Sequence, residues 1–65
     1  MNLRINGTSL QAEATTLAAL LIELDYDDAA VATAVNGGFV RRVDRATIVL
    51  AEDDAVEILT PRQGG

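Results

Sequence analysis

A stripe of leucines is the feature that most constrains how this chain can fold. The stripe consists of Leu17, Leu20, Leu21 and Leu24. Their i, i+3, i+4, i+7 spacing places all four side chains on one face of an α-helix. Thr15 and Thr16 come directly before the stripe and are candidate N-caps, because a hydroxyl can accept a hydrogen bond from a backbone N–H of the first turn. With only 65 residues the chain can build one core, so the leucine face must pack against the rest of a single domain.

The segments on both sides of this helix alternate between apolar and polar residues, which is typical of half-buried strands. Strands are predicted at residues 2–6, 8–12, 31–36 and 55–59, with a short return strand at residues 39–40. Asn6-Gly7 and Asn36-Gly37 fall between the members of two strand pairs. Asn-Gly is the strongest short hairpin signal, because both central positions of a type I′ turn need a positive φ. One hairpin is therefore expected before the helix and a second one after it.

This order of elements favours an α+β domain in which one main helix packs on one face of a mixed sheet of four to five strands. Leu10 and Ala12 are expected to point toward the core from the first return strand, and Tyr26 to cover the core just after the helix. Residues 41–47 are polar and without clear periodicity, so no element is assigned to them. Several small α+β topologies satisfy this order, because periodicity alone does not order strands.

Composition excludes several classes of protein. The chain has no Cys and no His, and all five of its basic residues are Arg. A disulfide scaffold and a zinc site of the usual Cys/His kind are therefore excluded, as are the commonest catalytic nucleophiles and bases. Ten acidic residues against five basic ones give a formal net charge of −5, which argues against nucleic-acid binding. No apolar run approaches the ~18 residues of a membrane span or resembles a signal peptide, so a cytoplasmic protein without membrane contact is expected.

Three charged clusters stand out. Arg41, Arg42 and Arg45 hold three of the five basic residues; the favoured interpretation is a solvated loop, and the alternative is a docking patch for an acidic partner surface. The acidic residues at 25–28 and 52–54 lack the ligand spacing of a twelve-residue calcium loop, its central Gly and its closing Glu, so no metal site is predicted. A chain this small also offers no evident cleft for the paired carboxylates of a hydrolase.

The C-terminus extends beyond the last predicted strand and ends in Gly64-Gly65. The six residues 60–65 reach ~20 Å when extended, which exceeds the ~11 Å radius of gyration expected for a domain of this length. Two terminal glycines leave the α-carboxylate without neighbouring side chains, so a narrow channel can admit it. The alternative is an ordinary frayed end. The chain is thus divided into a folded domain at residues 1–59 and a flexible tail at residues 60–65.

Two segments resemble a known family. Residues 34–42 (AVNGGFVRR) resemble an apolar strand, an Asn-Gly turn and then Val-Pro-Arg, and residues 56–65 (VEILTPRQGG) resemble a last strand and a terminal tail. Together they make the chain similar to ThiS-type sulfur carrier proteins of the ubiquitin-like β-grasp fold, which are related to MoaD-type carriers. The resemblance covers essentially the whole length and implies that the first and last strands pair in parallel. Three residues depart from the family: Arg41 replaces a Pro, Arg45 replaces a common aromatic residue, and Asp53 replaces a Gly.

The resemblance implies a carrier without catalytic residues or a cofactor of its own. A ThiF-like adenylating enzyme would use ATP and Mg²⁺ to activate the Gly65 carboxylate. Sulfur from a cysteine desulfurase would then form a thiocarboxylate, and a ThiG-like thiazole synthase would take that sulfur for thiamine. Gly64 and Gln63 would thread the channel. Leu59, Phe39 and Arg62 are candidate interface residues, although Phe39 could equally belong to the core.

The isolated chain is expected to be a monomer. Two other functions stay open on these residues. One is a carrier for molybdenum or tungsten cofactor assembly, as in MoaD-type proteins. The other is a ubiquitin-like interaction module with an inert tail.

Overall fold

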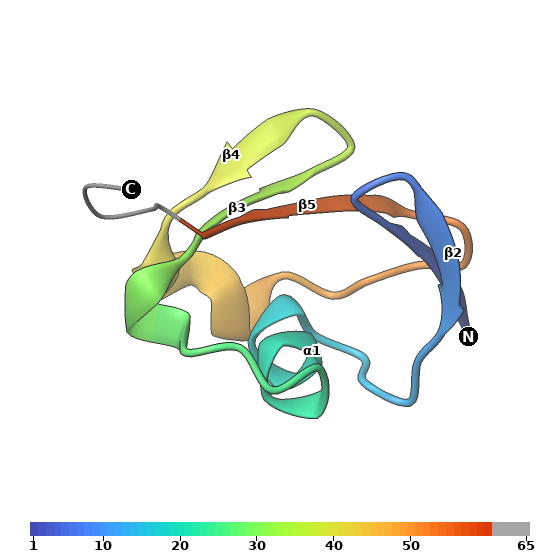
Figure 1. Ribbon diagram of the computed structural model, residues 1–65, viewed down its shortest axis with the longest axis horizontal. Helices are drawn as coiled ribbons and strands as arrows, with labels where there is room; N and C mark the ends of the chain where they lie inside the picture. The colour runs from blue at the N-terminus through green and yellow to red at the C-terminus, as the bar shows by residue number, and fades with distance from the viewer. Residues whose placement is uncertain (61–65) are drawn as a thin grey trace.

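The computed structural model describes residues 1–60 and shows a five-stranded mixed sheet with one main helix packed on one face (Figure 1). The strands are β1 (Asn2–Ile5), β2 (Thr8–Gln11), β3 (Ala32–Val35), β4 (Gly38–Val40) and β5 (Ala55–Leu59). The helices are α1 (Leu17–Glu23) and two short 3₁₀-helices, η1 (Asp28–Ala30) and η2 (Arg42–Thr47). The sheet order is β2-β1-β5-β3-β4, so the last strand lies in the centre. Among residues 1–60, no helix is long and apolar enough to cross a membrane.

Both Asn-Gly hairpins are confirmed. β1 pairs with β2, and β3 pairs with β4, each antiparallel. Asn6 and Asn36 have φ values of 50°, and Gly7 and Gly37 follow at 85° and 84°, which is the pair of positive φ angles that a type I′ turn requires. β5 then lies between the hairpins, parallel to β1 and antiparallel to β3. The predicted parallel pairing of the first and last strands is therefore present.

The predicted leucine stripe forms the inner face of α1. Leu17, Leu20 and Leu21 are fully buried, and Leu24 packs against them with partial exposure. Thr16 is the N-cap, since its Oγ1 accepts a hydrogen bond from the Ala19 N–H at 3.2 Å. The rest of the core comes from the sheet and its connections: Leu3, Ile5, Ala12, Val40, Leu50, Val56 and Ile58. Burying these side chains between one helix and one sheet face is the main stabilising contribution available to a domain of this size.

Leu10 and Ala12, which were both expected to point toward the core, differ in how far they are buried. Ala12 is buried, as predicted, but Leu10 remains 36% exposed although it lies opposite the fully buried Leu3. The reason is that β2 is an edge strand of the sheet, so one side of Leu10 has no neighbouring strand. Tyr26 packs against the core after α1, as predicted.

Two connections contain structure that the sequence patterns left unassigned. Residues 42–47, within the polar segment, form η2, and a second 3₁₀ turn, η1, follows Asp27. The side chain of Asp27 caps η1 by accepting a hydrogen bond from the Ala29 N–H at 3.0 Å. In the turn before β5, Asp53 adopts a φ of 68°, a conformation that Asp tolerates better than most residues other than Gly.

Candidate functional site

The strand that leads to the C-terminus is held on both of its sides. β5 ends at Leu59, which pairs with Ala32 on β3. On the other side, the Ile58 N–H donates to Asn6 Oδ1 at 2.8 Å, and Asn6 Nδ2 donates to the Ile58 carbonyl at 3.1 Å. The predicted tail residues Arg62, Gln63, Gly64 and Gly65 lie outside the described residues. The structure therefore defines the starting point of the C-terminal segment as the end of the central strand.

An apolar patch lies on the open face of the sheet beside the end of β5. The register places Ala32 opposite Leu59 and Ala34 opposite both Phe39 and Glu57, so these side chains share one face. Leu59 is 66% exposed and Phe39 is 73% exposed. With Ala32 and Ala34 they line a shallow recess of about 80 Å³ that also touches Glu57. Phe39 is thus not a core residue, and its role in an interface stays a prediction. We call Ala32, Ala34, Phe39 and Leu59 the sheet-face patch.

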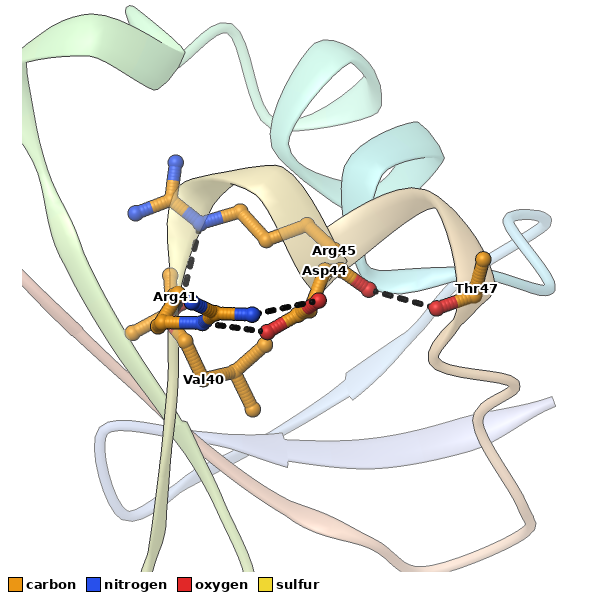
Figure 2. A network of polar contacts seen from close by, with 6 residues as sticks. Val40, Arg41, Asp44, Arg45 and Thr47 are labelled. Carbon is orange, nitrogen blue, oxygen red and sulfur yellow. Dashed lines mark hydrogen bonds and ion pairs between the residues drawn. The ribbon is translucent and has the colours of Figure 1, made fainter.

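The arginine cluster does not behave as a unit. Arg41 pairs with Asp44 at 2.8 Å, and Arg42 pairs with Asp28 at 3.1 Å, and all four side chains are substantially exposed. Arg45, in contrast, is only 3% exposed. Figure 2 shows the Arg45 side chain and, beside it, the Arg41–Asp44 pair. The prediction that Arg45 belongs to a solvated loop or to a docking patch is therefore wrong.

The guanidinium of Arg45 instead ties η2 to η1 and β3. It donates to Thr33 Oγ1 at 3.0 Å, to the Asp28 carbonyl at 2.7 Å and to the Val31 carbonyl at 2.8 Å. Thr33 is itself buried and donates to the Val40 carbonyl at 3.0 Å. A charged group can be buried when its donors find partners, and here all of the partners are neutral oxygens. Arg45 also lines a groove of about 330 Å³ between α1 and η2, on the helical side of the sheet.

Comparison with known proteins places this arrangement in a family. The model of the ThiS family matches residues 3–65. The chain belongs to the ThiS family. Members of this family are sulfur carriers and not enzymes. A comparison with curated protein sequences gave no match.

Solved structures of thiamine biosynthesis proteins have the same fold as this chain. The chain is similar to the crystal structure of the thiamine biosynthesis protein ThiS from Geobacter metallireducens, with 29% sequence identity, a TM-score of 0.84 and complete coverage of both chains. It is also similar to the solution structure of a thiamine biosynthesis protein from the same organism, with 29% identity and a TM-score of 0.81, over 100% of this chain and 88% of the other. The predicted ThiS-like β-grasp fold is therefore confirmed.

In this ThiS-family chain, the exposed Glu23 and the half-buried Asp54 accept hydrogen bonds from loop residues through their carboxylates. Glu23, at the end of α1, accepts from the Glu13 N–H at 2.9 Å and from the Ala14 N–H at 2.9 Å. Asp54, before β5, accepts from Asn36 Nδ2 at 2.9 Å and from the Ala51 N–H at 2.8 Å. These bonds favour the ionised forms. They lower the pKa of Glu23 below its ordinary value of 4.5 and the pKa of Asp54 below 3.8.

Acid is expected to weaken the fold through these two groups. A carboxyl group with a lowered pKa in the folded state stabilises the fold fully above its ordinary pKa, and this stabilisation is lost as pH falls through the lowered value. For Glu23 the loss therefore begins below about pH 4.5. We expect the urea midpoint of the wild type to fall more steeply below pH 4.5 than that of Glu23→Gln, and the two to converge at the lowest pH. Parallel pH profiles for the two proteins would contradict this assignment.

Proposed function

We propose that this chain is a sulfur carrier for thiazole formation in thiamine biosynthesis, and that the carboxyl group of Gly65 carries the sulfur. The observation that supports this most strongly is the ThiS-family match, which runs from residue 3 to the terminal Gly65. The ThiS relative with the same fold over its full length is a thiamine biosynthesis protein, which favours this pathway over molybdenum or tungsten cofactor assembly.

The chemistry must begin with activation of the carboxylate. A terminal carboxyl group has a pKa of roughly 3.3–3.7, so at neutral pH it is ionised and a poor electrophile. A ThiF-like enzyme with ATP and Mg²⁺ joins the Gly65 carboxylate to AMP and releases pyrophosphate. A cysteine desulfurase takes sulfur from cysteine as a protein persulfide, whose outer sulfur attacks the acyl carbon, displaces AMP and forms an acyl disulfide. A second thiol of the partner enzymes then attacks the inner sulfur of this acyl disulfide, so that a partner disulfide forms and the thiocarboxylate is released. The product is a thiocarboxylate at Gly65, and a ThiG-like thiazole synthase consumes its sulfur.

The composition of the chain suits this role. The acyl-adenylate is reactive toward thiols and amines, and the chain contains no Cys and no Lys. Its own side chains therefore offer neither of these competing nucleophiles. All catalytic groups are supplied by the partner enzymes, and the carrier provides a recognisable surface and a C-terminal segment that enters their active sites.

The sheet-face patch is the surface that we assign to partner docking. It lies beside the root of the C-terminal segment, and its recess of about 80 Å³ between Phe39 and Leu59 can take one aliphatic side chain of a partner. Aromatic residues beside a small pocket are typical anchors of interfaces, and Phe39 is the aromatic residue of this patch. Arg62, which lies outside the described residues, would extend this interface toward the tail.

Leu59→Ser is expected to raise the KM for adenylation of the carrier by about tenfold, because removal of an interface anchor typically costs 1–2 kcal/mol. The matched control is Ile22→Ser, which replaces another exposed aliphatic residue on α1, on the opposite side of the sheet from the patch. Ile22→Ser is expected to leave KM unchanged. The measurement is ATP-dependent pyrophosphate release by a ThiF-like enzyme from the same organism at varied carrier concentration. Equal KM values for the two variants would contradict docking through the patch.

The proposed function is tested with the same enzyme, ATP and Mg²⁺, with pyrophosphate release from the wild-type carrier as the readout. Release that requires both the carrier and the enzyme supports the proposal. Absence of release with an enzyme that is active on another ThiS carrier would contradict it.

A further inference from the structure

The asparagines of both hairpin turns contact the central strand through their side chains. Asn36 Oδ1 accepts from the Ala55 N–H at 2.9 Å, and Asn36 Nδ2 donates to Asp54 Oδ1 at 2.9 Å. Asn6 Oδ1 accepts from the Ile58 N–H at 2.8 Å, and Asn6 Nδ2 donates to the Ile58 carbonyl at 3.1 Å. Asn36 thus holds the start of β5, whereas Asn6 holds its end. Turn formation requires only the positive φ of these residues, so the contacts to β5 are an additional property.

The contact at Asn6 replaces a missing part of β1. The parallel pairing of β1 with β5 extends only through Arg4 opposite Ala55 and Ile5 opposite Val56. The Asn6 N–H still donates to the Val56 carbonyl at 2.9 Å, and the chain then turns away. The N–H and carbonyl of Ile58 point to the side where β1 has ended. A side-chain amide has the same donor and acceptor as a peptide group, so Asn6 pairs with Ile58 as one further strand residue would.

We propose that Asn6 is a positioning residue for the C-terminal carboxyl group of this carrier. Its amide holds Ile58, while Ala32 on β3 pairs with the next residue, Leu59, so the root of the C-terminal segment is fixed from both sides. Residues 59–65 span at most about 24 Å beyond Ile58, so the position of Ile58 sets the volume within which the carboxyl group can lie. A fixed root raises the effective concentration of the carboxyl group in a partner's active site. This inference rests on the proposed function.

The test compares Asn6→Gly with Asn36→Gly. Glycine adopts the same positive φ without strain, so each variant removes two side-chain hydrogen bonds while the turn is kept. We expect similar decreases in the urea midpoint for both variants. Only Asn6→Gly is expected to lower kcat for adenylation at saturating carrier, by about fivefold through the lost effective concentration, with KM unchanged. Amide hydrogen exchange at Ile58 should also accelerate in Asn6→Gly and not in Asn36→Gly.

Equal kcat values for the two variants, with the wild type adenylated normally, would overturn the positioning role. If the wild type is not adenylated at all, the proposed function fails, and amide exchange still tests whether Asn6 holds Ile58. Equal exchange rates at Ile58 in both variants would show that it does not. If Asn6→Gly does not fold, Asn6→Asp takes its place for kcat alone, because it loses the donor to the Ile58 carbonyl but keeps the acceptor for the Ile58 N–H. A kcat of Asn6→Asp equal to that of Asn36→Gly would again overturn the positioning role.

Discussion

Gly64→Ala is expected to reduce the rate of Gly65 adenylation by about a hundredfold, because a displacement of ~1 Å at a reacting group can cost this much. The added methyl group occupies the space that a narrow channel leaves for a backbone without a side chain. It also restricts the φ and ψ angles next to the reacting carboxyl group. The sheet and helices that the structure describes lie within residues 1–60, so we expect the free energy of unfolding not to change.

The matched control for this variant is Gln63→Ala, which removes side-chain volume one residue earlier in the tail. We expect it to be adenylated within about threefold of the wild type, since it adds no bulk to the channel. The measurement is single-turnover adenylation with saturating ThiF-like enzyme, with urea unfolding of each variant in parallel. Adenylation of Gly64→Ala at the wild-type rate would show that the channel argument is wrong.

Arg45→Ala is expected to lower the free energy of unfolding by about 3 kcal/mol, the scale for leaving buried polar groups without their partners. The substitution removes the donors to Thr33 Oγ1 and to two backbone carbonyls, and it leaves a cavity where a 3% exposed side chain lay. Domains have a total stability of about 5–15 kcal/mol, and small ones lie toward the low end. The variant should therefore be partly unfolded at 37 °C.

The control for Arg45 is Arg42→Ala, which removes an exposed ion pair with Asp28. Exposed ion pairs contribute about 0–1 kcal/mol, so this variant should unfold close to the wild type. Arg45→Met separates the effect of lost side-chain volume from the effect of lost hydrogen bonds, because Met fills much of the space of Arg45 but donates no hydrogen bond. We expect Arg45→Met to recover less than half of the free energy of unfolding that Arg45→Ala loses. If Arg45→Ala and Arg42→Ala unfolded at the same urea concentration, the assigned role of Arg45 would be contradicted.

The parts of the fold that the sequence predicts are those with a local physical cause. The positive φ of Asn6 and Asn36 follows from the needs of a two-residue turn, and the buried face of α1 follows from the spacing of its leucines. Strand β5 occupies the predicted residues 55–59, because alternation and the acidic turn before it are both local signals.

The role of Arg45 has no such local signal. Its acceptors lie 12 to 17 positions away along the chain, on η1, on β3 and on Val31 between them, and they come together only when the helices pack onto the sheet. A short run of arginines among polar residues is usually solvated, so composition pointed away from burial. The sequence therefore does not reveal that the Arg45 side chain is buried among neutral hydrogen-bond acceptors.

In the candidate site, too, features with a local cause can be predicted from the sequence, and features that join distant residues cannot. Exposure of Leu59 follows from its alternation with the buried Val56 and Ile58 along β5. Phe39 lies in a three-residue edge strand, where alternation is too short to choose between core and surface. The bonds from Asn6 to Ile58 join residues 52 positions apart, so the Asn-Gly signal revealed the turn but not its contact with the central strand.

Intact mass spectrometry of the chain, purified from cells that contain its partner enzymes, reads out sulfur at Gly65 itself. We expect a mass gain equal to the replacement of one oxygen by sulfur, located by fragmentation at Gly65 and absent from cells that lack the adenylating enzyme. An unmodified C-terminus in cells that are making thiazole would contradict the role of Gly65 as the sulfur-carrying residue. So would sulfur bound at any other residue.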